Sequence, residues 1–317
     1  MSSRRGAGTP GRGSGKGQGS GKGSGRPGGG GGGRSGGSGG RAGRAGGSGG
    51  RAGRPGSPGE RGGPSRRRRP QGLDGTQVEG RQAVRELLLA GRRRVREIHL
   101  SNEVERTGVV EDIVGLAGEL RVPIRAVSRS KLDHLARTDA PQGVVAIAEQ
   151  LPSEELSRLC APGEAGAPFL LALDGVTDPQ NLGALLRIAE CAGVTGVVLP
   201  RHRAAHVTPT VAKAAAGAAE YLPMSLVGGL PTAIEEMKAA GVWVVGLDMG
   251  GDTSVHDLTL GAQAVCLVLG AEGAGLSRLV RQRCDLVASI PLHGRLASLN
   301  VAAAGAVACY EVARRRG

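Results

Sequence analysis

The stretch GVTDPQNLGALLRIAECAGV at residues 175–194 predicts a helix that directly follows a strand. The strand is indicated by the apolar run FLLALDG at 169–175. Asp178 can cap the helix, and Pro179 suits its first position because a proline there gives up no helical hydrogen bond. One face of this helix then carries the apolar side chains that we expect to be buried, namely Leu182, Leu185, Leu186 and Ala189.

Arg187 lies well off this apolar face, and we expect it to point away from the core. An ion pair with Glu190, three residues later, would explain the arginine structurally. Such a pair stabilises a helix by only a few tenths of a kcal/mol. The pattern of the helix alone therefore leaves open whether Arg187 is a surface residue or part of a site.

Composition divides the chain near residue 73. Residues 1–73 hold 14 arginines and two lysines against one acid, so they carry +15, while the remaining residues carry −2 of the total charge of +13. The same segment holds 31 of the 58 glycines and almost nothing apolar. Because it cannot bury enough surface to offset the entropy of ordering, we expect a disordered basic tail that contacts RNA phosphates. A solvated leader that only keeps the protein soluble is the alternative.

Other features of composition indicate a cytoplasmic protein. We expect no secretory signal, and no apolar run reaches the roughly 18 residues that a membrane span needs. The cysteines are odd in number and lack the spacing of a zinc knuckle or redox motif. They are predicted to be small core residues in a reducing compartment: Cys160, Cys191, Cys266, Cys284 and Cys309.

Two α/β domains are predicted after the tail. In residues 76–150, helical patterns at 81–91, 108–120 and 130–137 alternate with strand patterns at 95–100, 122–127 and 142–149. A linker rich in Pro, Gly and Ser is predicted at 151–167. In residues 168–317 we expect strands at 169–175, 196–200, 243–247, 264–270 and 286–292, and helices around 180–193, 209–219, 230–240, 275–283 and 298–316. The short apolar strands favour a parallel sheet that helices cover on both faces.

Two further strand ends in the second domain carry unusual residues, and ligands of open α/β sheets bind at the carboxyl ends of strands. In LVLGAEGAGLSRLV at 267–280, three glycines surround Glu272, and a glycine lets the backbone approach a ligand closely. In the segment 288–316, Ser298 can cap a long C-terminal helix that closes with arginines. Taken singly, each segment could be an ordinary turn or cap.

Together and in this order, three segments resemble motifs one, two and three of the SpoU/TrmH family of RNA ribose 2′-O-methyltransferases. They are NLGALLR at 181–187, GAEGAG at 270–275 and SLNV at 298–301. The resemblance extends from about residue 76 to the C-terminus. It is strongest to the RlmB-type members, which methylate a guanosine of 23S rRNA in the peptidyl-transferase region.

The resemblance implies a fold and a cofactor. Residues 168–317 would form a SPOUT domain with a deep trefoil knot, and residues 76–150 would form a small L30e-like domain that selects the RNA. S-adenosylmethionine would be held in the knot, mainly by backbone groups. The positions implied to line it are Leu269, Gly270, Ala271, Gly275, Ile290 and Leu299. Glycines at 270 and 275 would let the purine and ribose approach the main chain.

The resemblance also implies catalytic roles. Arg187 would reach the RNA phosphate and help to take the proton of the 2′-hydroxyl, although a guanidinium that is always charged is a poor base. Asn181 would shape the same pocket and Glu272 would position the groups of motif one. Ser298 and Asn300 would hold the knot loop and the hydroxyl. Where relatives often have serine after SLNV, this chain has alanines at 302–304, which puts a hydroxyl contact from that turn in doubt.

Family members act as homodimers, with motif one of one subunit near the cofactor of the other, and this would explain an outward-pointing arginine. The expected partner is therefore RNA, with no DNA and no membrane. Three alternatives stay open: a tRNA ribose methyltransferase, an rRNA methyltransferase that confers antibiotic resistance, and a non-catalytic RNA-binding or ribosome-assembly factor. A nicotinamide-dependent enzyme is disfavoured because no GxGxxG follows the first strand of either domain.

Overall fold

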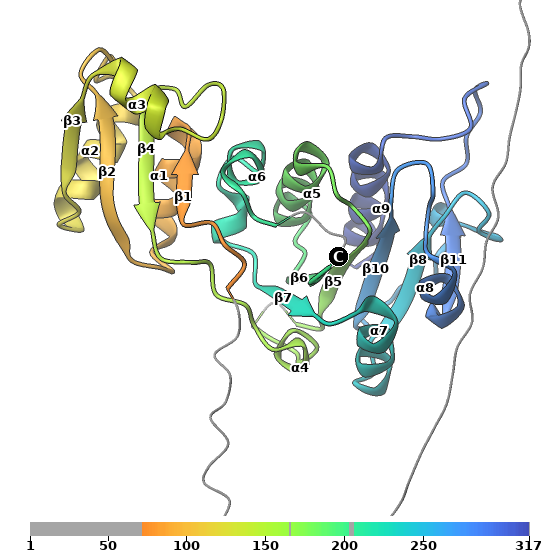
Figure 1. Cartoon of the computed structure of the whole chain (residues 1–317). Coiled ribbons are helices and arrows are strands. Elements are labelled where there is room, and N and C mark those ends of the chain that lie inside the picture. Colours follow the sequence, from red (N-terminus) through yellow and green to blue (C-terminus); the bar gives the residue numbers. More distant parts are fainter. Residues whose placement is uncertain (1–71, 165, 203–205, 317) are drawn as a thin grey trace, which may run out of the picture. The chain divides into compact units, whose positions relative to one another are not determined.

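Strands and helices alternate along the described part of the chain, as the apolar patterns predict. The computed structural model describes residues 72–164, 166–202 and 206–316 (Figure 1). The basic tail predicted for residues 1–73 therefore lies outside the described residues up to residue 71. The described residues all belong to one compact unit. No helix in the described part of the chain combines the length and the apolar character needed to cross a membrane.

The smaller domain is a four-stranded mixed sheet with helices on both faces. Its strands lie in the order β1-β4-β2-β3, with β4 antiparallel to β1 and β2, and β2 parallel to β3. The elements are β1 (Gln77–Glu79), α1 (Arg81–Ala90), β2 (Val95–Ser101), α2 (Val109–Glu119), β3 (Ile124–Val127), α3 (Arg129–Leu135) and β4 (Val144–Ala148). Buried apolar side chains of α1, α2 and the sheet form one core cluster, and Leu132 of α3 belongs to a smaller one.

The larger domain is built on a seven-stranded sheet in the order β7-β6-β5-β10-β8-β11-β9, and each pair of neighbours is parallel. The strands are β5 (Phe169–Asp174), β6 (Gly196–Pro200), β7 (Met224–Val227), β8 (Trp243–Leu247), β9 (Thr253–Ser254), β10 (Val265–Gly270) and β11 (Leu286–Ser289). The helices are α5 (Pro179–Cys191), α6 (Pro209–Ala214), α7 (Leu230–Ala239), α8 (Arg278–Arg283) and α9 (Val301–Arg316), with a 3₁₀ turn η1 (Ala218–Glu220) before β7.

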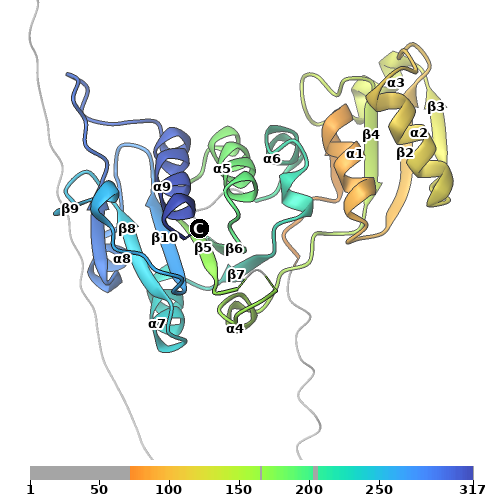
Figure 2. The same ribbon diagram turned by 180° about the vertical axis from the view of Figure 1, so that it is seen from behind.

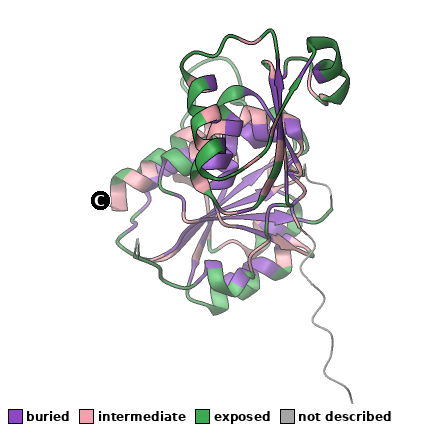
Figure 3. Cartoon of the chain, turned by 90° about the vertical axis from the view of Figure 1, so that its left-hand side faces the viewer, coloured by how far each residue is buried: buried purple, intermediate pink, exposed green. Residues whose placement is uncertain are grey.

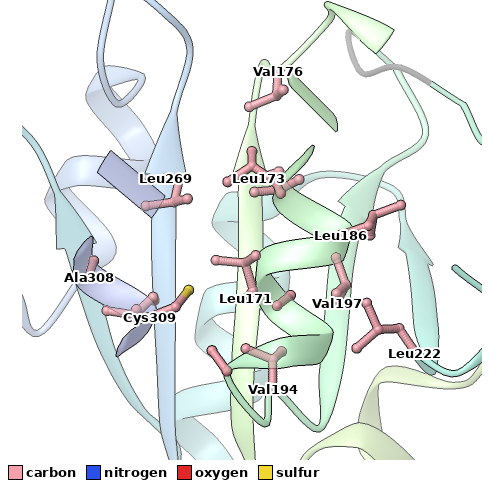
Figure 4. Close-up of a cluster of buried hydrophobic side chains, with 14 of the residues drawn as sticks. Leu171, Leu173, Val176, Leu186, Val194, Val197, Leu222, Leu269, Ala308 and Cys309 are labelled. Atoms are coloured by element: carbon pink, nitrogen blue, oxygen red, sulfur yellow. The ribbon is translucent and has the colours of Figure 1, made fainter. Parts of the chain in front are cut away.

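Helices cover both faces of this sheet, which explains why its central strands are apolar throughout. On one face, Leu171, Leu173 and Leu269 of the strands pack against α5 and α9. Figure 4 shows these leucines together with Leu186 of α5 and with Ala308 and Cys309 of α9. On the other face, alternate residues of β5 and β10 pack against α7, α8 and the short helix α4 (Leu156–Leu159). The two clusters leave the strands buried, as Figure 3 shows in purple, so that the sheet is accessible to a ligand mainly at the strand ends.

The register aligns the carboxyl ends of three central strands. Gly270 at the end of β10 pairs with Asp174 at the end of β5, and Leu269 pairs with Leu247 at the end of β8. The chain leaves β10 through α8 to reach β11 beyond β8, and from β11 it returns to α9, which packs against α5 and β10 (Figures 1 and 2). Crossing connections of this kind are rare in open sheets, and this topology is compatible with the trefoil knot that the resemblance implies.

A buried ion pair joins the two domains. Arg93, in the turn between α1 and β2, donates from Nε and Nη2 to the Glu220 carboxylate at 2.9 and 2.6 Å. The side chains are only 2% and 3% exposed. The Arg93 guanidinium also donates to the carbonyls of Gly75 and Glu149, which lie in the two segments that connect the domains. A single side chain therefore fixes both connecting segments to the larger domain.

The structure differs from the sequence prediction at several points. Strands β1, β7 and β9 were not predicted, and the linker at 151–167 contains the short helix α4. Leu73, which composition placed in the tail, is 1% exposed and packs in the core of the larger domain. Cys160, Cys266 and Cys309 are buried as expected, but Cys191 is exposed at the end of α5.

Candidate active site

A cavity of about 360 Å³ opens at the carboxyl ends of β8, β10 and β11. Its walls are formed by residues 269–273 and 275 at and after the end of β10, by residues 289–292 at and after the end of β11, and by residues 297–299 and 301 leading into α9. Residues 247–249 at the end of β8 lie beside them. All six positions that the resemblance assigns to the cofactor line this cavity, namely Leu269, Gly270, Ala271, Gly275, Ile290 and Leu299. The long-range packing of the sheet thus brings the second and third motifs to one place.

A chain of side-chain hydrogen bonds links the three motifs at the edge of the cavity. Asn181 Nδ2 on the first turn of α5 donates to Glu272 Oε2 at 3.1 Å. Asn300 Nδ2 at the start of α9 donates to Asn181 Oδ1 at 3.0 Å. The amide of Asn181 is thereby held on both sides, so the three predicted residues form a single unit. Glu272 also lines the cavity, where it presents a carboxylate to any ligand.

The loop after β10 needs glycine for a reason that the sequence prediction missed. We expected glycines at 270 and 275 because a ligand must approach the backbone. A Cβ at Gly270 would instead lie 2.1 Å from the carbonyl carbon of Gly275, because Ala271 and Gly275 exchange two backbone hydrogen bonds across the loop. Gly275 has φ +65, and a Cβ there would lie 2.6 Å from Asp248 Oδ2. The loop is therefore closed on itself before any ligand binds.

Asp248 is a site residue that the sequence analysis did not find. It directly follows β8 and lines the cavity. Its Oδ1 accepts hydrogen bonds from the Gly250 amide at 3.0 Å and from Arg281 Nη1 at 2.6 Å, and its Oδ2 accepts one from the Leu276 amide at 3.2 Å. Burial by itself raises the pKa of this carboxyl, but the three hydrogen bonds outweigh burial and hold the pKa below its ordinary value.

Ser298 does not cap the C-terminal helix, contrary to our expectation. The helix α9 begins at Val301, and Asn300 Oδ1 accepts from the amides of Ala302 and Ala303 at 2.9 and 3.3 Å. Asn300 is therefore the cap, because it is the residue whose side chain reaches the free amides of the first turn. Ser298 lines the cavity instead and is exposed, so its hydroxyl is accessible to a ligand.

Arg187 is exposed on α5, as predicted, and it is not among the residues that line the cavity. It lies six residues beyond Asn181, which places it about 9 Å further along the helix axis. No ion pair found among the described residues includes Arg187, so the pair with Glu190 is not formed. Within the described part of the chain, Arg187 is thus a guanidinium without an ion-pair partner, on the same helix as Asn181 but outside the cavity of its own protomer.

The lining of the cavity suits a nucleoside that carries a positive charge. Its volume lies in the usual range for small-ligand sites. The walls are mostly backbone and apolar side chains such as Ile290 and Leu299, and among the described residues the lining includes the carboxylates of Asp248 and Glu272 but no Lys, Arg or His. Arg281 compensates the negative charge of Asp248, whereas Glu272 accepts its side-chain hydrogen bond from the neutral amide of Asn181. No cluster of metal-ligating side chains occurs in the described part of the chain.

Comparison with known proteins agrees with this geometry. The model of the SpoU rRNA methylase family matches residues 168–310, which contain all three motifs. A model described as an RNA 2′-O ribose methyltransferase substrate-binding domain matches residues 77–154, the smaller domain.

Individual relatives match over nearly their whole length. A protein of Pseudomonas aeruginosa named 23S rRNA (guanosine-2′-O-)-methyltransferase RlmB is 40% identical, over 76% of this chain and 96% of the relative. A putative TrmH family tRNA/rRNA methyltransferase of Bacillus subtilis is 38% identical, over 75% of this chain and 95% of the relative. The crystal structure of the SpoU methyltransferase AviRb of Streptomyces viridochromogenes, in complex with AdoMet, has a TM-score of 0.64 at 28% identity and covers 75% of this chain and 89% of that one. The chain belongs to the SpoU family of RNA 2′-O-ribose methyltransferases.

Proposed function

We propose that this protein transfers a methyl group from S-adenosylmethionine to the 2′-hydroxyl of a guanosine in 23S rRNA, in the peptidyl-transferase region. The observation that carries the proposal is that the second and third motifs line one cavity, and that Asn181 of motif one joins them at its edge through hydrogen bonds with Glu272 and Asn300. The choice of 23S rRNA is supported by the name of the P. aeruginosa relative. The name of the B. subtilis relative leaves tRNA as the second candidate.

S-adenosylmethionine supplies an activated methyl group when it is bound, and the chain supplies the binding site. The loops around Gly270, Ile290 and Leu299 offer backbone groups and apolar walls for the nucleoside. The Glu272 carboxylate favours a ligand with a positive charge because no cation in the lining compensates it. The apolar walls also exclude water, which strengthens this electrostatic contribution.

The reaction requires alignment and activation of a ribose hydroxyl, which is a very weak acid in water. Asn181 and Asn300 hold Glu272 in place at the edge of the cavity. Ser298 presents its hydroxyl where the ribose would enter. Arg187 supplies a fixed positive charge that anchors the RNA phosphate and stabilises the negative charge that develops on the ribose oxygen. As this oxygen bonds to the methyl carbon, the methyl–sulfur bond breaks with its electron pair remaining on sulfur, and the hydroxyl proton passes to solvent water.

The position of Arg187 supports a homodimer. Because Arg187 lies outside the cavity of its own protomer, a second subunit must bring the arginine to the cofactor. The helices α5 and α9 pack side by side, and α9 exposes Val307 and Tyr310, which are 37% and 53% exposed and lie one turn apart. Pairing of these helices about a twofold axis would cover both side chains and place each arginine near the cavity of the other subunit.

Substitution of Arg187 tests this proposal. We expect Arg187→Ala to reduce methyl transfer to RNA at least 100-fold while the affinity for S-adenosylmethionine stays within about twofold, because the arginine acts on the RNA and not on the cofactor. Radiolabelled methyl transfer and calorimetry measure the two quantities. Arg187→Lys should retain part of the rate if the charge acts as an anchor. The exposed Arg158, with its pair to Glu154 on the other side of the sheet, provides a matched control in Arg158→Ala.

Activity of Arg187→Ala at the wild-type rate would contradict the catalytic role. The target is established by mapping ribose methylation across rRNA and tRNA in cells that lack the protein, and a methyl group lost from tRNA alone would replace 23S rRNA as the substrate. We also propose a cytoplasmic location, because the substrate is ribosomal RNA and the five cysteines are free thiols.

A further inference from the structure

The loop after β10 forms one wall of the cavity, and its shape is fixed at its base. The amide of Ala271 donates to the carbonyl of Gly275 at 3.1 Å, and the amide of Gly275 donates to the carbonyl of Ala271 at 2.9 Å. Glu272 belongs to this closed loop and is exposed, and its carboxylate accepts the hydrogen bond from Asn181. The direction in which the loop points therefore depends on what holds residues 275 and 276.

Asp248 holds that end of the loop from the neighbouring strand. Its Oδ2 accepts from the Leu276 amide, immediately after the closing pair, and lies only 2.6 Å from where a Cβ of Gly275 would be. Its Oδ1 accepts from the Gly250 amide and from Arg281 on α8. Arg281 Nη2 also donates to the carbonyl of Gly250 at 2.6 Å. One carboxylate thus ties together the end of β8, the loop after β10 and helix α8.

The Asp248 carboxylate is not part of either hydrophobic cluster of the sheet. It is 17% exposed, it lies on the cavity wall, and its hydrogen bonds go to backbone amides of two loops and to the Arg281 side chain. Neutralisation by Arg281 leaves Glu272 as the uncompensated charge of the lining. These two observations point to a role of Asp248 in the shape of the cavity wall rather than in direct electrostatic attraction of the cofactor.

We propose that Asp248, together with Arg281, is a positioning residue that holds the loop 271–275 in the conformation that binds S-adenosylmethionine. This proposal rests on the proposed function. It assigns a role to a residue that lies outside the three sequence motifs. Because residues of this loop line the cavity that we assign to the cofactor, we expect loss of Asp248 to change the affinity for the methyl donor and to leave the chemical step intact once the donor is bound.

The experiment compares Asp248→Asn and Asp248→Ala with Asp252→Asn in the full-length protein. Asp252 is an exposed aspartate four residues later in the same segment, so it is a matched control for the loss of one charge. Calorimetry gives Kd for S-adenosylmethionine, and steady-state assays give KM for each substrate and kcat at saturating donor. Removal of a charged hydrogen-bond partner predicts a rise of about 10-fold or more in Kd and KM for S-adenosylmethionine. The RNA KM and kcat should stay within about twofold, and Asp252→Asn should match the wild type.

A second variant tests the proposal in case the Asp248 variants fail to fold. Arg281→Met removes the ion pair and the hydrogen bond to the Gly250 carbonyl but leaves the backbone hydrogen bonds of Asp248 in place, so it should weaken donor binding by less than Asp248→Ala does. Unchanged donor affinity in folded Asp248 and Arg281 variants would overturn the proposal, as would a fall in kcat without a change in KM. Absence of S-adenosylmethionine binding by the wild-type protein would overturn the proposed function itself.

Discussion

Because the Arg93–Glu220 ion pair is buried, we predict that breaking it causes a large loss of folding stability. Substitution Glu220→Gln keeps the size of the side chain but removes the negative charge. The Arg93 guanidinium, with 2% of its side chain exposed, then stays charged with no ionic partner. Breaking one partner of a buried ion pair costs about 3–5 kcal/mol, because the remaining charge is uncompensated. That is a large fraction of the about 5–15 kcal/mol by which a typical domain is stable.

Urea denaturation followed by circular dichroism measures this loss. With a slope of about 3 kcal/mol per M, a loss of 3–5 kcal/mol lowers the unfolding midpoint by about 1–1.7 M. The control is Glu154→Gln, which breaks the exposed pair with Arg158, whose side chain is 78% exposed. That pair should contribute less than about 1 kcal/mol. The double variant Arg93→Met with Glu220→Leu should recover part of the loss, because it leaves no unpaired charge. Equal effects of Glu220→Gln and Glu154→Gln would refute the reasoning.

Two further substitutions test local features of the larger domain. Gly270→Ala should lower the affinity for S-adenosylmethionine at least 10-fold in calorimetry, because a Cβ there would approach the opposing backbone of the loop to 2.1 Å. The control is Gly294→Ala, whose Cβ would meet nothing within 4 Å, and this variant should bind S-adenosylmethionine normally. Hydrogen bonds from Arg314 and Arg315 lower the pKa of Glu311 from 4.5 to about 2. The stabilising contribution of the Glu311 carboxylate is therefore complete above pH 4.5 and is lost as the pH falls toward 2. In denaturation experiments over that interval, Glu311→Gln should lose less stability than the wild type does. Equal acid sensitivity of the two proteins would contradict the assignment.

The strongest sequence signals predicted the architecture of the larger domain. Apolar runs at 169–175, 243–247 and 264–270 correspond to β5, β8 and β10, because a strand covered on both faces has no polar side chains to interrupt the pattern. The strand β9 has two residues and β1 has three, and so short a segment shows no periodicity. The missed strand β7, with the sequence MSLV, is equally short and includes a polar residue.

The site was predicted less completely, for reasons that lie in tertiary structure. Family resemblance identified the loops, but the reason for glycine at 270 is a contact with residue 275 that no pattern reveals. Asp248 could have been found from its place directly after a predicted strand. Arg93 and Glu220 are 127 residues apart, and nothing in either local sequence indicates that they meet.

The two segments that connect the domains lie side by side. The Leu73 amide donates to the carbonyl of Leu151 at 3.0 Å, and the Leu151 amide donates to the carbonyl of Asp74 at 2.9 Å. The intervening 75 or so residues therefore leave and rejoin the larger domain at nearly the same point. A module attached in this way can be exchanged for another without any change in the spacing of its ends, so recognition of a new RNA could evolve while the chemistry of the catalytic domain is conserved.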